Sequence, residues 1–173
     1  MTTGLFLKAS VVAALADILL LILLKRLISR KRFTEAGRFI LLFSGLFFGI
    51  LWTIVLHWGW DWFYVYVFPI WMKQLGWAWG AAYAFLGWGM WWLAQKFSSP
   101  ILTWFLLGGV EGVATHAWAI WVGGVIRKPP IIQGSNPAAV LLFACFEKIF
   151  YWLIILGLAV GVSIISQKMR RSN

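Results

Sequence analysis

The chain is divided into runs of about twenty consecutive apolar residues, and this pattern limits its possible folds more than any other feature. A helix rises ~1.5 Å per residue, so such a run spans roughly 30 Å, the thickness of the hydrocarbon layer of a bilayer. Hydrophobic residues make up 62% of the 173 positions and charged residues 12%, well outside the usual composition of soluble domains. The mean hydropathy is +0.87. The sequence therefore predicts an all-α, polytopic bundle of transmembrane helices.

Five predicted spans account for the whole chain, which we interpret as a single membrane-embedded domain over residues 1–173. The spans cover residues 5–24, 39–56, 76–94, 100–126 and 138–165, and an aromatic external loop covers residues 57–75. Two spans carry a clear start signal, because Ser99-Pro100 and Asn136-Pro137 place a capping residue before a proline at the first helical position. No basic segment precedes the first span and no small-residue cleavage site follows it, so we expect it to remain in the mature protein.

Basic residues flank the spans unequally, and this asymmetry predicts the orientation. One side holds Lys25, Arg26, Arg30, Lys31, Arg32, Arg38, Lys96, Lys168, Arg170 and Arg171, and the other holds Lys8, Lys73, Arg127 and Lys128. Lysine and arginine concentrate in cytoplasmic segments, so the N-terminus is expected outside and the C-terminus in the cytoplasm. We expect a multi-pass protein of the cell membrane, with an organelle membrane as the alternative. These flanks explain the net charge of +10, and no nucleic-acid partner is expected.

Several ionisable residues fall inside the predicted spans, namely Asp17, Glu111, His116, Glu147 and Lys148. A charged residue near the centre of a transmembrane helix costs about 2.5 to 3.5 kcal/mol on insertion scales, whereas one Leu, Ile or Phe contributes only about 0.3 to 0.6 kcal/mol in favour. These residues are therefore expected to face the interior of the bundle. For Asp17 we expect an ion pair with Lys148 or a hydrogen bond to a neighbouring helix.

The fourth span holds the most informative pattern. Gly108, Glu111, Thr115 and Trp118 lie three or four residues apart and share one face, and the neighbouring face consists mostly of small residues. Small residues let another helix backbone approach closely. Glu111 and His116 point about 140° apart at ~100° per residue, so each needs a partner on another helix.

The outer half of the bundle is predicted to gather the candidate catalytic residues, which are Glu111, Glu147, His116, His57 and Asp61. Burial in hydrocarbon favours the protonated form of a carboxyl group, which suits proton transfer. The candidate substrate-binding residues are Thr115, Trp118, Trp60 and Trp62. The last two lie in the external segment, where aromatic residues recur at every second position from Trp58 to Phe68. That segment is either an interfacial belt or a lid over the site.

No cofactor and no metal ion is expected from the sequence. The two histidines stand on different predicted elements, and no Glu-x-x-His or His-x-x-x-His pair occurs. There is no glycine-rich phosphate loop and no serine elbow. Cys145 is the only cysteine and lies in an apolar run, so a disulfide framework is excluded.

Three classes of function stay open. The first is a membrane-embedded enzyme that acts on a lipid, sterol or isoprenoid-like apolar substrate through carboxylate and histidine proton chemistry. The second is an accessory subunit of a larger membrane complex, and the third is a small proton- or cation-coupled transporter subunit. The expected partners are the lipid bilayer, an apolar small-molecule ligand, and either further copies of the chain or a membrane complex. An accessory subunit would place its acids outside the bundle, and a transporter usually shows internal repeats or broken helices, which this sequence lacks.

Overall fold

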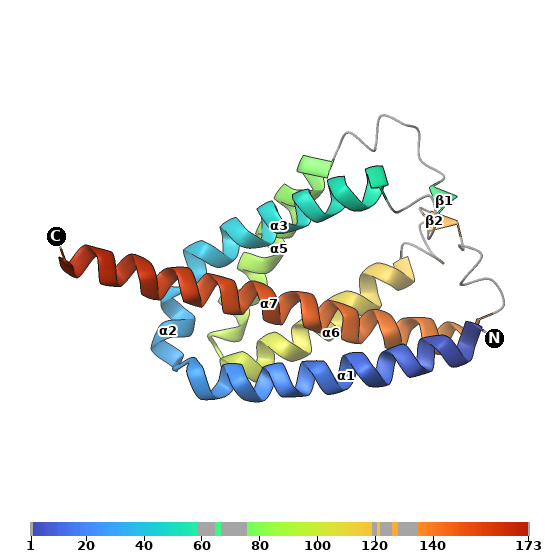
Figure 1. Cartoon of the computed structure of the whole chain (residues 1–173), viewed down its shortest axis with the longest axis horizontal. Coiled ribbons are helices and arrows are strands. Elements are labelled where there is room, and N and C mark those ends of the chain that lie inside the picture. The colour runs from blue at the N-terminus through green and yellow to red at the C-terminus, as the bar shows by residue number, and fades with distance from the viewer. Residues whose placement is uncertain are drawn as a thin grey trace.

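The computed structural model describes residues 2–58, 65–66, 76–118, 121, 126–127 and 135–172. These residues form an all-α fold with one short strand pair (Figure 1). The helices are α1 (Thr2–Leu27), α2 (Arg30–Glu35), α3 (Gly37–Trp58), α5 (Gly76–Ala94), α6 (Pro100–Ala117) and α7 (Pro137–Ser172), and the strands are β1 (Val65–Tyr66) and β2 (Ile126–Arg127). Each predicted span thus overlaps one long helix, while the short α2 was not predicted.

Two helices of the described part, Thr3–Leu27 and Pro137–Ser172, are long and apolar enough to cross a membrane by length and composition. They differ in their surroundings. Helix α1 leaves large apolar residues exposed over most of its circumference, whereas α7 buries a nearly continuous face from Ala139 to Ser163. The core of the molecule therefore lies around α7.

Helix α7 is the central element, and α1, α3 and α6 all pack against it, while α5 packs mainly against α3. Helices α1 and α7 run in the same direction. At their starts the backbone N–H of Asn136 donates to the Thr3 hydroxyl at 3.1 Å, and further along Leu24 lies beside Gly157. Figure 1 shows α3 and α5 diverging from α6 and α7 toward the end of the molecule where β1 and β2 lie.

The two ends of the helix bundle differ in charge. At one end the Arg30 guanidinium donates to the carbonyl of Gln95 at 2.9 Å, and the Gln167 amide donates to the Glu35 carboxylate at 2.9 Å. This end holds all ten basic residues that the sequence assigned to one side, and each of them is exposed. We call it the basic end. The opposite end, where β1 pairs antiparallel with β2, is the loop end.

Helix boundaries depart from the predicted spans at two places. Helix α6 ends at Ala117, and Ile126–Arg127 form β2 rather than the last turn of the predicted fourth span. The predicted end of this span at residue 126 is therefore wrong, and the sequence places two poor helix formers, Gly123 and Gly124, within that part of the predicted span. Helix α7 continues beyond residue 165 to Ser172, and its last two turns stand at the basic end.

The start of α7 is capped as the sequence predicted, because the side-chain oxygen of Asn136 accepts a hydrogen bond from the backbone N–H of Ala138 at 2.9 Å. We expect Asn136→Ala to lower the free energy of unfolding by about 1 kcal/mol, the usual effect of losing an N-cap side chain. Thermal unfolding of the protein in detergent micelles measures this loss. Asn136→Asp restores the acceptor and should restore the melting temperature, and equal losses in both variants would contradict the cap.

Candidate functional site

The candidate site is built where α6 and α7 approach most closely. A side chain at Gly108 would begin 3.0 Å from the Trp152 ring, and one at Gly112 would meet the backbone carbonyl of Ala144. At Gly112 only glycine leaves room for this approach, because the clashing atom belongs to the backbone. Glu111 lies between these two glycines, so its side chain is brought directly against α7 and is 7% exposed.

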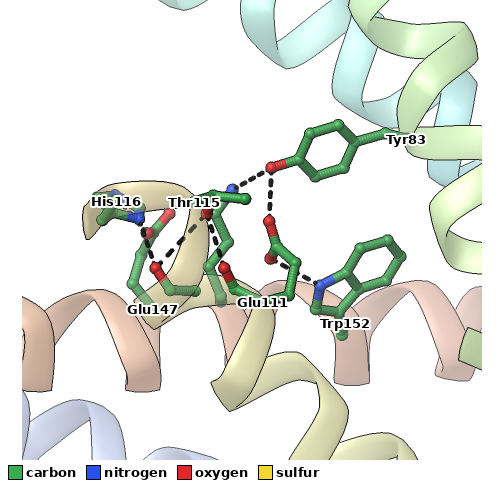
Figure 2. A network of polar contacts seen from close by, with 8 residues as sticks. Tyr83, Glu111, Thr115, His116, Glu147 and Trp152 are labelled. Atoms are coloured by element: carbon green, nitrogen blue, oxygen red, sulfur yellow. Dashed lines mark hydrogen bonds and ion pairs between the residues drawn. The ribbon is translucent and has the colours of Figure 1, made fainter. Parts of the chain in front are cut away.

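Both carboxylate oxygens of Glu111 accept hydrogen bonds, as Figure 2 shows. The hydroxyl of Tyr83 on α5 donates to Oε1 at 2.8 Å, and the indole N–H of Trp152 on α7 donates to Oε2 at 3.1 Å. The carboxylate therefore ties three helices together. The prediction that Glu111 faces inward and finds its partners on other helices is confirmed.

Lys148 on α7 extends this arrangement. Its ammonium donates to the Tyr83 hydroxyl at 3.2 Å and lies 5.0 Å from the centre of the Tyr83 ring. The Tyr83 oxygen thus accepts from Lys148 and donates to Glu111. We call Tyr83, Glu111, Lys148 and Trp152 the Glu111 network. A hydroxyl placed between an ammonium and a carboxylate can receive a proton on one side while it releases one on the other.

Aromatic rings close the network toward the basic end. The Trp152 ring stacks on the Tyr83 ring with 6.0 Å between centroids, and the Trp104 ring packs edge-on against Trp152 at 5.5 Å. The Trp104 indole N–H donates to the Trp152 carbonyl at 2.8 Å, and the Phe33 ring from α2 packs against Trp104. Trp104, Trp152 and Phe33 are fully buried. We call these three side chains the aromatic floor.

A second polar pair lies nearer the loop end. The imidazole Nε2 of His116 lies 3.8 Å from a carboxylate oxygen of Glu147, and its Nδ1 lies 2.9 Å from the Gly112 carbonyl. The side chain of His116 is 19% exposed and that of Glu147 is 44% exposed. Exposure therefore rises from the Glu111 network toward this pair, which makes the pair the more accessible part of the site.

The structure brings only some of the predicted site residues together. The Thr115 hydroxyl donates to the backbone carbonyl of Glu111 at 2.8 Å, so it bonds within its own helix, and the Trp118 side chain is 49% exposed. The backbone of His57 belongs to α3, but its side chain lies outside the described part of the chain. Asp61, Trp60 and Trp62 also lie outside the described residues.

Three members of the Glu111 network, Tyr83, Lys148 and Trp152, were not among the predicted site residues, although Lys148 was expected inside the fifth span. Trp152 follows Lys148 by four positions, so a shared helix face could have been read from the sequence. Tyr83 is 28 residues from Glu111, and no spacing rule connects the two. A polar-tipped aromatic residue in an otherwise apolar span was the one available signal, because a buried tyrosine hydroxyl usually has a hydrogen-bond partner.

An apolar groove lies apart from the Glu111 network, between α3 and α5. Its volume is about 340 Å³, and it is lined by Leu41, Leu42, Gly45, Leu46, Gly80, Ala81 and Ala84. No acid or histidine contributes to this lining. The groove offers only hydrocarbon contacts, so the acid–base groups of the described residues lie elsewhere.

The described residues contain no group of three or more His, Cys, Asp or Glu side chains that could hold a metal ion. What they do contain is a buried carboxylate with two hydrogen-bond donors, a lysine–tyrosine contact next to it, and a more exposed histidine–carboxylate pair. These are groups that bind and transfer protons. No protein-family model, no curated protein and no solved structure matches the chain.

Proposed function

We propose that this chain is a multi-pass protein of the cell membrane and an enzyme that transfers protons to or from a lipid, sterol or isoprenoid-like apolar substrate. In this proposal five helices cross the bilayer, the loop end faces outward and the basic end faces the cytoplasm. Supporting observations are the exposed apolar surface of α1 and the ten exposed basic residues gathered at one end.

The observation that carries the enzymatic proposal is a difference in exposure, because the His116–Glu147 pair is partly exposed whereas the described Glu111 network is buried. Glu111 and Lys148 are buried, His116 is intermediate and Glu147 is exposed, so exposure increases in the direction of the loop end. Toward the basic end the fully buried rings of the aromatic floor pack against the network. A transporter needs a polar path on both sides of its site, whereas an enzyme needs an inner reaction site with a single entrance.

The burial of Glu111 also favours an enzyme over an accessory subunit. A subunit that used its acids to hold partner helices would present them on the outer surface, but both oxygens of Glu111 bond to side chains of this chain. In the proposed reaction Glu147 and His116 stand at the entrance as acid and base for the substrate. Glu111 supplies or takes up the proton through Tyr83 and Lys148. His57 and Asp61 are proposed to assist from the external segment.

The test uses the whole chain in lipid nanodiscs with photoactivatable analogues of a phospholipid, a sterol and a polyprenol. Labelled positions are mapped by peptide mass spectrometry, and conversion of the unmodified lipids is followed by chromatography and mass spectrometry. We expect one probe class to label the loop-end halves of α6 and α7, and the matching unmodified lipid to be converted.

We expect Glu147→Gln to keep the labelling and to lose at least ~90% of the conversion, since removing a general acid or base typically costs a factor of about 10² to 10⁴ in rate. The matched control is Glu35→Gln, which removes an acid at the basic end and should leave conversion unchanged. Equal conversion by the protein and by Glu147→Gln, or loss in Glu35→Gln alone, would rule out the proposed site.

A further inference from the structure

The environment of Asp17 on α1 differs from the one that the sequence predicted. Its side chain is fully buried, and neither carboxylate oxygen has a hydrogen-bond partner among the residues that the structure describes. The expected ion pair with Lys148 or hydrogen bond to a neighbouring helix is therefore wrong. The reason is geometric, because the ammonium of Lys148 extends to Tyr83.

Asp17 belongs to a narrow contact stripe through which α1 packs on α7. Ser10, Asp17 and Leu24 are the buried residues of this stripe, spaced seven apart, and most of the remaining α1 surface is exposed and apolar. The Ser10 hydroxyl donates to the carbonyl of Phe6 at 2.7 Å, so it bonds within its own helix and not to Asp17. On the facing helix, Leu24 meets Gly157.

No positive charge in the described residues compensates Asp17. On α7, Cys145 interacts electrostatically with Asp17, and a thiol supplies no counter-charge. The acid on α6, Glu111, is bound by Tyr83 and Trp152. An ionised carboxylate is strongly disfavoured when it is buried with neither a donor nor a cation, whereas the neutral acid is a modest polar group.

We infer that Asp17 is an intramembrane proton-binding site, separate from the Glu111 network, and that the neutral acid is the form in which α1 packs on α7. The ligand of this site is a proton, held on a carboxyl oxygen between two helices. The inference uses only the burial and the missing partners of Asp17, so it stands or falls independently of the proposed enzymatic activity.

Dicyclohexylcarbodiimide provides the test, because this apolar reagent adds to protonated carboxyl groups in apolar surroundings. The whole chain in nanodiscs is treated with it at neutral pH, and the adduct is located by peptide mass spectrometry. We expect an adduct at Asp17 and none at Glu111, whose two oxygens are occupied. The adduct should be lost in Asp17→Asn and kept in Ser10→Ala, the control from the same stripe.

Two further measurements distinguish a bound proton from a bound metal ion and from a carboxylate that is open to water. Sodium ions at high concentration should not protect Asp17 from the reagent, and a water-soluble carbodiimide should not label it. Protection by sodium would make Asp17 a metal-cation site. Labelling by the water-soluble reagent would show that Asp17 is open to water and not enclosed in the contact stripe. Either result overturns the inference. Asp17→Asn should melt at the parent temperature or above, because the amide imitates the neutral acid, and a large drop in melting temperature would also overturn it.

Discussion

Gly112→Leu should be strongly destabilising, with a loss of about 3 kcal/mol in the free energy of unfolding, at the upper end of overpacking effects. The first atom of any side chain at this position would meet the carbonyl of Ala144 and would come within 2.7 Å of the Lys148 Cβ. A backbone oxygen cannot rotate away, so α6 and α7 must separate. The separation also pulls Glu111 away from Trp152, and any catalytic activity should be lost with it.

The measurement is thermal unfolding in detergent, where each kcal/mol corresponds to roughly 2 to 4 °C for a chain of this size. Gly89→Leu is the matched control, because nothing lies within 4 Å of a side chain built at Gly89. It should melt at or above the parent temperature, since leucine is a better helix former than glycine by about 0.5 to 1 kcal/mol. Similar losses in the two variants would show that α6 and α7 are not held as closely as described.

Glu111→Leu should lower the free energy of unfolding by about 2 to 6 kcal/mol, because it removes the acceptor of two buried donors at about 1 to 3 kcal/mol each. The donors are the Tyr83 hydroxyl and the Trp152 indole N–H. Glu111→Gln keeps one acceptor oxygen but turns the other into a donor, so its loss should be about half as large. Unfolding of both variants in the same detergent measures the order of effects.

A double-mutant cycle between Glu111→Leu and Tyr83→Phe tests the contact itself, because each single substitution removes the hydrogen bond. Side chains that share a hydrogen bond are expected to show a coupling energy of about 0.5 to 3 kcal/mol, whereas distant ones add within about 0.5 kcal/mol. Glu147→Gln combined with Tyr83→Phe is the comparison pair, because Glu147 pairs with His116. Additive losses in the first cycle would contradict the 2.8 Å hydrogen bond.

The sequence was most informative about features that depend on neighbours along one helix. The pairs Ser99-Pro100 and Asn136-Pro137 predicted where α6 and α7 begin, although Asn136 makes a side-chain cap hydrogen bond and Ser99 does not. The glycines around Glu111 predicted a close helix approach, and Gly112 now lies against Ala144. Both inferences follow from the ~3.6-residue repeat and from the small size of glycine, which hold without knowledge of the tertiary structure.

Contacts between helices could not be derived in the same way. The hydrogen bond from Tyr83 and the one from Trp152 cross 28 and 41 residues of sequence, so they depend on how α5 and α7 rotate about their axes. The same rotation points Lys148 toward Tyr83. Asp17 therefore lies in the contact stripe between α1 and α7 without Lys148 as a partner. Charge alone suggested the opposite pairing, because one sequence specifies which groups need partners but not which helix faces meet.

The unbroken length of α7 gives the molecule a mechanical property. Its 36 residues extend about 54 Å at ~1.5 Å per residue, against roughly 30 Å of bilayer hydrocarbon, so the helix is a stiff rod that projects from the bundle. Gln167 of α7 forms a hydrogen bond with Glu35. Trp152 lies about 22 Å away from Gln167 along the same helix. Because Gln167, Lys148 and Trp152 belong to one unbroken helix, a displacement of α7 at the basic end would shift Lys148 and Trp152 together relative to Tyr83.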